Sequence, residues 1–427
     1  MSYKRLVVLL LTLCIGFIIF SYLKIALSEN NEATCVIYNI EDLQTVDFKD
    51  YKTVTVSANI VYNADLFKQF LQGENYRDAW HAKIEAPVLF LDTLYGGVEI
   101  VKEGGGTQTT SLRVKSKNDL LLTLRSVNKD PSHHVPDLAK SLGIENVVHD
   151  GISGQHPYAA LVVSELLDNL DILHTKPQIV FLPQQETLGE RYNDDYGNRL
   201  YFLEFENKGS AEWINRPDAV KLVDTDNLQE LKMELGESLS IDKRKLIRAR
   251  LFDLVIGDWD RHAKQWGWLI KQKDSVYSAE PLPVDRDNAF FSVDGLIPNV
   301  ISNQNITPHL QSFENTIANL DGLIYDFDVY FLQQTNERDF IAEAQLIKDK
   351  LDQNAIDAAF MVWNANLRHL DEEQLKRKIN ARLDALIPIA KAFKQILDAR
   401  PLLDQPLKGS NYKDTNGKLL QCFECSK

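Results

Sequence analysis

The spacing of apolar residues along the chain predicts a β-rich first half followed by a helical second half. Runs typical of strands occur at 53–58, 96–102, 119–125, 178–182 and 200–205. Apolar residues three and four positions apart, which are typical of helices, occur at 157–172, 340–351 and 375–397. We expect Pro388 to kink the last of these helices. This order of elements indicates an α+β protein.

A further helix is predicted to lead into an acidic loop. Its apolar residues recur at helical spacing: Leu246, Ile247, Leu251, Leu254 and Val255. Gly257 is a residue type that commonly ends a helix. Two strand-like runs, 266–271 and 276–278, then form a hairpin that returns the chain to a second acidic cluster at 283–291. We therefore expect two loops that carry carboxylates to face one another.

Two facing carboxylate loops suit phosphoryl transfer, in which one carboxylate orients the attacking hydroxyl and another holds Mg²⁺ on the phosphates. The alternative is a solvated acidic surface, or a buried Asp-Arg-His network that only holds two hairpins together. We favour the functional interpretation because carboxylates at this density need a cation or a proton to coexist. The adjacent aromatic and imidazole side chains are expected to have structural roles: Trp259, Trp266, Trp268 and His262.

The residues of the two loops follow a recognisable order. Asp-x-Asp-Arg-His at 258–262 leads into Gln265, and Asp285 is followed five residues later by Phe. This pattern resembles the catalytic and metal-binding loops of the atypical kinases, which include HipA-type kinases, secretory-pathway protein and glycan kinases, and phosphoinositide lipid kinases. The resemblance implies that Asp260 is the catalytic base, and that Asp285, Gln265 and Asp287 hold Mg²⁺ or Mn²⁺. Gln265 departs from the Asn that those families usually place there.

A glycine-rich stretch ahead of the acidic loops is the candidate flap over a nucleotide. Its proposed nucleotide contacts are Gly104, Gly105, Gly106, Gln108 and Thr109. Glycines let backbone N–H groups approach phosphate oxygens, although three glycines are as often a simple turn. In the strand that follows, Arg125 is the candidate phosphate-binding cation, and Lys129 is the reserve. Ordinary kinases use a strand Lys for this purpose.

Two glutamates are further candidates for the nucleotide-binding site. Glu165 is the Glu on the predicted helix 157–172, and it would pair with Arg125 if this helix corresponds to the small-lobe helix of kinases. It is equally consistent with a solvated helix residue. Glu204 ends a predicted strand at the expected hinge between two lobes, where a nucleotide would bind.

The first 28 residues are predicted to target the chain to a membrane. Lys4 and Arg5 precede an uncharged apolar run at 6–23, which is at the lower limit for spanning a bilayer. Basic residues on that flank keep the N-terminus in the cytoplasm, so the bulk of the chain is expected to be periplasmic or lumenal. The segment 26–28 is a passable cleavage site, but we favour an uncut signal anchor over a cleaved signal peptide.

Composition limits the classes of partner. The net charge is -14, and 44% of the residues are hydrophobic. An acidic, globular chain of this kind is not expected to bind nucleic acid or an anionic membrane surface as its main partner. Beyond the apolar run the cysteines are Cys35, Cys422 and Cys425. We favour a disulfide in the C-terminal C-x-x-C motif, with a redox pair or half a zinc site as alternatives.

Four motifs, two of them from the stretches described above, follow one another along the chain. They are Tyr-Arg-Asp-x-Trp at 76–80, Gly-Gly-Gly-x-Gln-Thr at 104–109, Leu-Arg-Ser-Val-Asn-Lys-Asp at 124–130 and Gly-Asp-Trp-Asp-Arg-His at 257–262. This succession is similar to that of a group of bacterial envelope-directed proteins of unassigned activity. The likeness implies a compartment and gives no substrate.

These observations predict a two-lobed protein-kinase-like fold behind an N-terminal membrane helix. The expected segments are the signal segment 1–28, an N-terminal extension 29–75, a β-rich nucleotide-binding lobe 76–206, an α-rich catalytic lobe 207–402 and a tail 403–427. The predicted function is phosphoryl transfer from ATP, or another nucleotide, to an unidentified hydroxyl of a protein, glycan or lipid. The alternatives are a catalytically impaired, pseudokinase-like binding module and, less favoured, a metal-dependent hydrolase.

Overall fold

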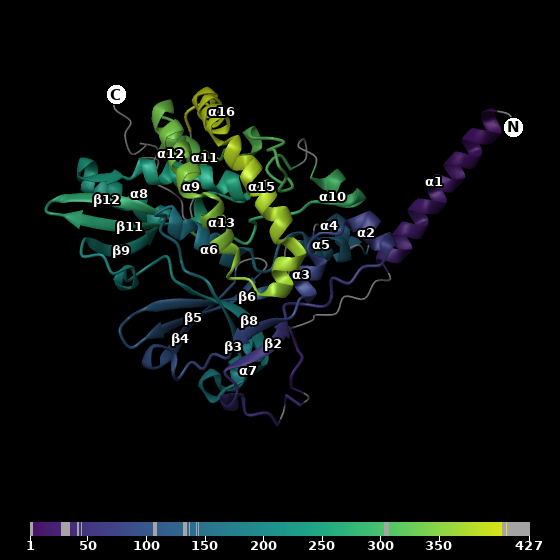
Figure 1. Cartoon of the computed structure of the whole chain (residues 1–427), viewed down its shortest axis with the longest axis horizontal. Coiled ribbons are helices and arrows are strands. Elements are labelled where there is room, and N and C mark those ends of the chain that lie inside the picture. The colour runs from purple at the N-terminus through teal and green to yellow at the C-terminus, as the bar shows by residue number, and fades with distance from the viewer. Residues whose placement is uncertain are drawn as a thin grey trace.

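The computed structural model describes residues 3–26, 35–40, 42–43, 45–105, 109–130, 135, 137–141, 143, 145–302, 307–403 and 407. These residues form an α+β protein with three β-sheets (Figure 1). The largest sheet is antiparallel, with the strand order β4-β5-β6-β8-β7. Its strands are β4 (Val98–Gly104), β5 (Thr109–Ser116), β6 (Leu121–Lys129), β7 (Gln178–Leu182) and β8 (Arg199–Phe205).

Alternation of side chains gives this sheet an apolar face. Leu112 and Val114 on β5 lie on the same face as Leu122 and Leu124 on β6, and all four are buried. They pack in one apolar cluster with residues of β7 and β8. Full burial of such a side chain contributes on the order of 1.5–3 kcal/mol, so this face holds the sheet to the segments beneath it.

A second sheet has four strands in the order β10-β12-β11-β9. The strands are β9 (Ala219–Asp224), β10 (Leu239–Ile241), β11 (Trp266–Lys273) and β12 (Val276–Pro283). The pair β11–β12 is the predicted hairpin, and it continues five residues beyond the expected end at 278. Trp266 and Trp268 on β11 are fully buried, and Trp266 stacks on Phe327, which confirms the packing role expected of them.

Helix α9 (Lys243–Ile256) is the predicted helix that leads into the first acidic loop. Asp242 caps its N-terminus by accepting a hydrogen bond from the Lys245 backbone N–H, and Gly257 ends it with a left-handed φ of 70°. A Cβ at Gly257 would lie 2.5 Å from the ring of Phe313, so the position requires glycine for its space as well as its φ. The start of the acidic loop is therefore fixed by packing.

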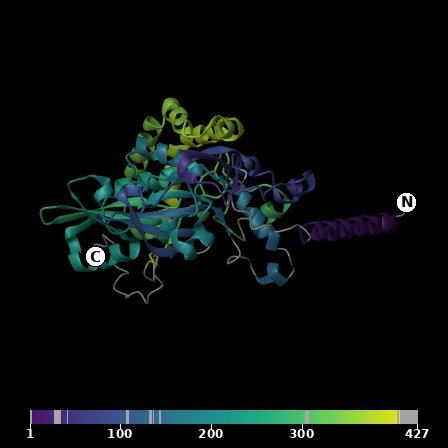
Figure 2. The same ribbon diagram turned by 90° about the horizontal axis from the view of Figure 1, so that it is seen from below.

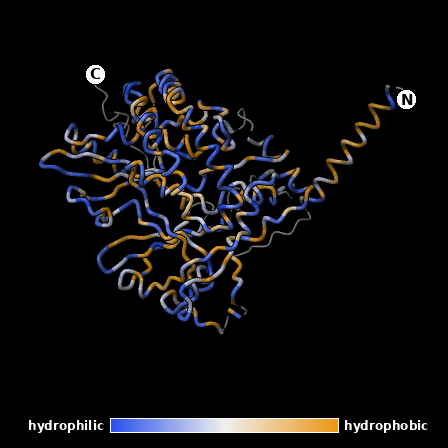
Figure 3. Tube along the Cα trace, in the orientation of Figure 1, coloured by the Kyte–Doolittle hydropathy of each residue, from blue (hydrophilic) through white to orange (hydrophobic). Residues whose placement is uncertain are grey.

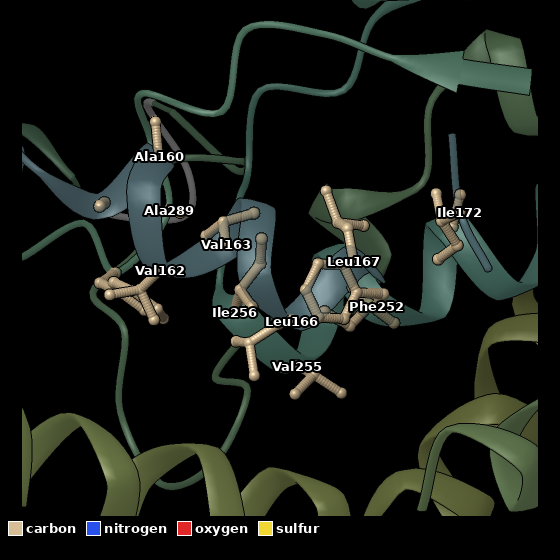
Figure 4. Packing of buried hydrophobic residues seen from close by; sticks show 14 of the residues in the cluster. Ala160, Val162, Val163, Leu166, Leu167, Ile172, Phe252, Val255, Ile256 and Ala289 are labelled. Carbon is tan, nitrogen blue, oxygen red and sulfur yellow. The ribbon is translucent and has the colours of Figure 1, made fainter. Parts of the chain in front are cut away.

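Helix α6 (Ala159–Asn169), the predicted helix at 157–172, packs against α9 in the centre of the molecule. Figure 4 shows Val163, Leu166 and Leu167 of α6 beside Phe252 and Ile256 of α9. All five residues are buried in the main apolar core. Deleting one of these side chains would cost about 2–5 kcal/mol, because the cavity could not close fully.

A third, small sheet joins the N-terminal region to this core. It consists of β1 (Val36–Ile37), β2 (Thr53–Ser57) and β3 (Ile84–Pro87). Val54 and Val56 of the expected N-terminal extension are fully buried in the main core. The Tyr-Arg-Asp-x-Trp motif is structural here, since Arg77 forms a buried ion pair with Asp150. The extension is thus packed as an integral part of the body.

The C-terminal part of the chain is helical, as predicted. The helices are α11 (Asp326–Leu332), α12 (Glu337–Lys350), α13 (Gln353–Phe360), α14 (Ala365–Leu367), α15 (Glu373–Asp384) and α16 (Leu386–Ala399). The helix expected at 375–397 is two helices that meet at Ala385. Pro388 lies in the first turn of α16, where its missing N–H removes no helical hydrogen bond, so the break replaces the expected kink.

The remaining helices of the body are short. They are α2 (Leu66–Gln72), α3 (Arg77–His81), α4 (Asp137–Ser141), α5 (Glu145–Asp150), α7 (Gly189–Tyr196), α8 (Thr225–Leu235) and α10 (Leu296–Ile301). In Figure 1 the five-stranded sheet occupies the lower part of the body, and α12, α15 and α16 occupy the upper part.

Helix α1 (Tyr3–Ala26) projects away from the body in both orientations (Figures 1 and 2). Its segment Tyr3–Lys24 has a mean hydropathy of 2.8, and Figure 3 shows it apolar over most of its length. Within the described residues it is the helix that is long and apolar enough to cross a membrane. Cys35 is a buried free thiol, whereas Cys422 and Cys425 lie outside the described residues.

Candidate functional site

The two predicted acidic loops lie against one another. The first follows α9 and the second follows β12, and the Val284 backbone N–H donates to the carbonyl of Gln265 at 3.0 Å. The buried Arg261 side chain fastens the loops together, because it donates to the carbonyls of both Val284 and Gln265 at 2.9 Å. The hairpin β11–β12 thus returns the chain as the sequence pattern predicted.

Three of the predicted site residues meet at this junction. Gln265 Nε2 donates to Asp260 Oδ2 at 3.5 Å and to Asp285 Oδ2 at 3.2 Å. One amide nitrogen contacts both carboxylates, so these carboxylates face the same small volume. Asp260 and Asp285 are partly exposed, with 25% and 43% of their side chains accessible. We call Asp260, Gln265 and Asp285 the open group.

Asp285 has an unusual backbone conformation. Its φ is 55°, in the left-handed region that side chains other than Asn and Asp seldom adopt. Backbone conformations of this kind persist only where the surrounding structure enforces them, and they are concentrated at functional sites. The conformation turns the carboxylate of Asp285 toward Gln265 and Arg125.

Arg125 reaches the open group from β6 of the five-stranded sheet. It contacts Asp285 at 3.0 Å, and it also forms ion pairs with Glu204 and Asp287. Burial disfavours its charge, yet the carboxylates of Asp287, Glu204 and Asp285 together raise the pKa of Arg125 well above its usual range. The predicted phosphate-binding cation is thus already held among carboxylates.

Asp287 lies on the Arg125 side of the second loop. Lys129 contacts it at 2.9 Å, and Arg125 pairs with it as well. Burial opposes ionisation, but these two cations hold the pKa of Asp287 well below its usual range. Its position between two cations suits an anchor for Arg125 better than a metal ligand.

Glu204, on β8, is the strand partner of the cation. It accepts from Thr175 Oγ1 at 2.8 Å with one oxygen and pairs with Arg125 through the other. Glu165 is exposed on α6, so the helix-borne partner considered from the sequence is replaced by a strand-borne one. Arg125, Glu204 and Asp285 line a pocket together with Ser164 and other residues of α6.

A separate, buried set of charges lies beneath the open group. Its carboxylates are Asp253, Asp258 and Asp328, and its guanidinium groups are those of Arg250, Arg261 and Arg286. We call these six residues the buried network. Burial raises the pKa of Asp258 to about 7, although Arg261 and Arg286 lower it. Asp258, the first carboxylate of the Asp-x-Asp-Arg-His motif, therefore belongs to this support.

His262 borders Asp260. Its Nε2 lies 3.5 Å from Asp260 Oδ1, and its Nδ1 accepts from the backbone N–H of Lys264 at 3.2 Å. Burial lowers the pKa of His262, while the Asp260 carboxylate raises it. The hydrogen bond from the Lys264 N–H to His262 caps the short helical turn 263–265, which agrees with the structural role expected of His262.

Gly104 ends β4 and Thr109 begins β5, so the glycine-rich stretch is the connection between these two strands, and we call this connection the glycine turn. Gly106 and Gln108 lie outside the described residues. Gly105 has a φ of 118°, and a Cβ there would lie 2.3 Å from the carbonyl oxygen of Thr109. The close approach of the two strand ends thus requires glycine at position 105.

Strand register places this turn beside the candidate cation. Gly104 on β4 pairs with Ser111 on β5, and Ser111 pairs with Arg125 on β6. Thr109 pairs with Lys129 one step closer to the turn. The strand ends that flank the glycine turn therefore lie at the end of the sheet that carries Arg125 and Lys129.

The fit of a divalent cation depends on added phosphate oxygens. Among the described residues, no three His, Cys, Asp or Glu side chains form a ready metal cluster. Mg²⁺ is commonly held by one or two carboxylates together with substrate phosphates, which suits the open carboxylate of Asp285. Gln265 would ligate through its amide oxygen, so a bound cation requires the amide to turn over from the orientation it has here.

Sequence reasoning missed Asp253, Arg286 and Thr175. Asp253 and Arg250 are three residues apart on α9, within the stretch that carries its apolar residues, and this spacing is a signal for an ion pair. Thr175 and Arg286 carry no such local signal, because their partners come from distant strands and loops.

Comparisons with known proteins add little. No protein-family model matches the sequence, and no curated protein matches it. One solved structure, described as the crystal structure of a Helicobacter pylori proinflammatory kinase CtkA, is 17% identical, with a TM-score of 0.38. The match covers 70% of this chain and 96% of that chain. At this TM-score the two chains are similar at most in outline, so the function must be judged from the geometry of the site.

Proposed function

We propose that this protein is an atypical kinase-like phosphotransferase that uses ATP, or another nucleotide, with Mg²⁺ or Mn²⁺. The observation that carries the proposal is the open group. Gln265 Nε2 joins Asp260 and Asp285 within 3.5 Å, and Arg125 reaches Asp285 from a different sheet. Carboxylates from two loops and a cation from a strand below a glycine turn form the set that phosphoryl transfer requires.

The proposed roles follow from exposure and position. Asp260 accepts the proton of the acceptor hydroxyl as its oxygen attacks the terminal phosphorus of the nucleotide. The bond from that phosphorus to the bridging oxygen breaks, and the nucleoside diphosphate leaves with the bonding electrons. Arg125, with Lys129 behind it, provides positive charge next to the glycine turn, where the phosphates would lie.

A divalent cation, when bound, neutralises charge on the phosphates. Asp285 would hold it, and Gln265 would assist through its amide oxygen. For Arg125 to contact phosphate it must exchange part of its ion pairing with Asp285 and Asp287 for the incoming oxygens. Glu204 and Thr175 keep the guanidinium in place during this exchange.

The arrangement of the elements supports a two-lobed kinase-like organisation. The cation comes from the five-stranded sheet, and the carboxylates come from the loops after α9 and β12. A nucleotide bound between them would contact both parts. The acceptor is a hydroxyl of unassigned class, on a protein, a glycan or a lipid.

A pseudokinase-like nucleotide-binding module is the second candidate. It is favoured by the double ion pair of Arg125 with Asp285 and Asp287, which neutralises the groups that a metal and a phosphate would need. A chain locked in this state would hold nucleotide weakly and transfer nothing.

A paired assay separates these candidates. The full chain in detergent is heated with ATP, GTP or ADP, each with and without Mg²⁺ or Mn²⁺, and the same samples are assayed for phosphoryl transfer. A ligand that binds the folded state alone raises Tm. A metal-dependent rise with transfer supports the kinase, and a rise without transfer supports the pseudokinase. Phosphate release without an acceptor would identify a hydrolase, and no rise with any nucleotide would contradict the first two assignments.

The proposed site of action is outside the cytoplasm, with α1 as the anchor. Lys4 and Arg5 on the N-terminal flank support this orientation. A reporter fused after Lys427 should be active on the translocated side of the membrane. Activity of a cytoplasmic reporter at that position would contradict the orientation.

A further inference from the structure

Helix α2 presents apolar side chains to the surface directly beside α1. Leu66 is 84% exposed and Phe70 is 57% exposed, and they lie on one face of α2 because they are four residues apart. Exposure of a phenyl ring and a leucine on neighbouring turns is unfavourable in water. Leu296 at the start of α10, which packs against α2, is also exposed. We call Leu66, Phe67, Phe70 and Leu296 the α2 face.

Aromatic contacts connect the α2 face to α1. The ring of Phe17 lies 6.1 Å from that of Phe67 and 6.5 Å from that of Phe70, measured between centroids. The ring of Phe20 lies 5.0 Å from that of Phe67. These are edge-to-face contacts of the kind that stabilise aromatic pairs. The α2 face is therefore continuous with the apolar surface of α1 (Figure 1).

The position of these contacts along α1 determines how deep the α2 face would lie in a bilayer. Phe20 and Phe17 lie three and six residues before Leu23, the last residue of the uncharged run. At 1.5 Å per residue, they are about 5 and about 9 Å inside the end of that run. Helices that lie in the membrane interface bury their apolar face to a depth of about 5–10 Å. The rings of Phe67 and Phe70 lie at this depth whenever α1 spans a bilayer.

Charged residues lie at one edge of the α2 face. Lys24, directly after the uncharged run, forms an ion pair with Asp65 at 3.4 Å, and Asp65 caps the N-terminus of α2. Lys68, one turn further along α2, pairs with the buried Asp150. The exposed Lys24–Asp65 pair thus lies at the end of α2 where lipid headgroups and water would be, and the pair of Lys68 with Asp150 fastens α2 to the body.

We propose that the α2 face is a membrane-docking surface, inserted into the leaflet that adjoins the globular body. The inference rests on α1 remaining in the chain as a membrane helix, and it is independent of the proposed phosphotransferase activity. Its occupant is the acyl region of the bilayer. Docking at α1 and α2 together fixes the orientation of the body on the membrane, where a single spanning helix would leave the body free to rotate.

The test uses tryptophan as a depth probe in the full chain. Three variants, Leu10→Trp, Phe70→Trp and Val276→Trp, are reconstituted in phosphatidylcholine vesicles with or without lipids brominated near the upper part of the acyl chain. The emission of the parent, which has 6 tryptophans, is subtracted from that of each variant. Leu10 reports on α1, and Val276, which is exposed on the distant β11–β12 hairpin, is the control.

Phe70→Trp should be quenched by the brominated lipid at least two-fold more than Val276→Trp, and Leu10→Trp should be quenched as well. If Leu10→Trp is quenched and Phe70→Trp behaves like Val276→Trp, α1 is in the membrane and the docking surface is refuted. If Leu10→Trp escapes quenching, the membrane premise itself fails. Shielding of Phe70→Trp that grows with protein concentration and is insensitive to bromine would show that a second copy of the chain covers this face, and the lipid assignment would be wrong.

Discussion

Two groups of carboxylates come from the same short stretch of sequence and have opposite environments. The buried network contains Asp253 and Asp258, whose side chains are fully buried and paired with arginines. The open group contains Asp260, only two residues further on, and Asp285 from the second loop, both partly exposed. The fold therefore divides one acidic segment into a support and a candidate reactive surface.

The difference shows that a cluster of carboxylates in the sequence does not by itself indicate a metal site. Carboxylates that lie close together need positive charge nearby. Arginines supply that charge for Asp253 and Asp258, so a metal is not needed there. Between Asp260 and Asp285 the direct link is the neutral amide of Gln265, and of these two carboxylates the cation Arg125 contacts Asp285. An incoming cation gains most at the open group, since its carboxylates are accessible and incompletely neutralised.

The largest effect is a loss of stability, which we expect when the buried network is broken. Asp253→Ala leaves three guanidinium groups near an empty buried position, because Asp253 contacts Arg250, Arg261 and Arg286. Loss of one partner from a buried ion pair costs about 3–5 kcal/mol. Urea unfolding of the full chain should show this loss in the free energy of unfolding. Asp260→Ala, the matched change in the open group, should leave that free energy nearly unchanged; equal losses would erase the distinction between the groups.

The second prediction concerns phosphoryl transfer, for which the open group should matter most. Asp260→Ala should lower phosphoryl transfer by roughly a hundred- to ten-thousand-fold, the range typical of removing a general base. Nucleotide affinity should survive, because this carboxylate acts chiefly in the transition state. Single-turnover transfer and a thermal-shift titration measure the two quantities. Asp349→Ala, at an exposed position on α12, is the control for loss of a carboxylate. Transfer at the parent rate in Asp260→Ala would remove the proposed base.

The third prediction concerns pH. Burial raises the pKa of Asp258 to about 7 in the folded protein, against about 3.9 in an unfolded chain. The folded state therefore binds this proton more tightly than the unfolded state, and the resulting stability is complete below pH 4 and is lost as pH rises toward 7. Asp258→Asn should abolish this loss. The free energy of unfolding of parent and variant, compared from pH 5 to 8, gives the answer, and parallel profiles would contradict the assignment.

The smallest effect is expected for Gln265→Asn. The change shortens the side chain by one methylene, toward the Asn of the atypical kinase loops that the sequence pattern resembles, and keeps an amide. We expect metal-dependent nucleotide binding to persist within about ten-fold, since an amide oxygen remains available as a ligand. Gln265→Met is the comparison that removes the amide while keeping the length of the side chain. If both variants bind alike, the amide has no part in the metal site.

The elements that carry the site were predictable from the sequence. The periodicity of 246–255, the stop at Gly257 and the hairpin predicted at 266–278 are local signals, and together they bring Asp260 and Asp285 onto adjoining loops. Alternation along β6 also placed Arg125 away from the buried leucines. Local patterns determine these features because each depends on neighbouring residues alone.

The division into two carboxylate groups was not predictable in the same way. Asp258 and Asp260 are equivalent in the sequence pattern, and their burial differs because Arg261 and Arg286 pack around Asp258 from two loops. The partner of Arg125 is Glu204 because β6 pairs with β8, a contact between distant strands that no local signal encodes. Long-range packing therefore decides which charges are available for chemistry.

The most direct test of the open group is Asp285→Asn. Asparagine keeps the shape of Asp285 and tolerates its left-handed backbone, so the variant removes the charge with little strain. The measurement is the rise in Tm of the full chain on addition of ATP with Mg²⁺. The parent should show the rise and Asp285→Asn should lose it, while Asp349→Ala should keep it. A rise in Asp285→Asn equal to that of the parent would contradict the assignment of a metal and nucleotide site to the open group.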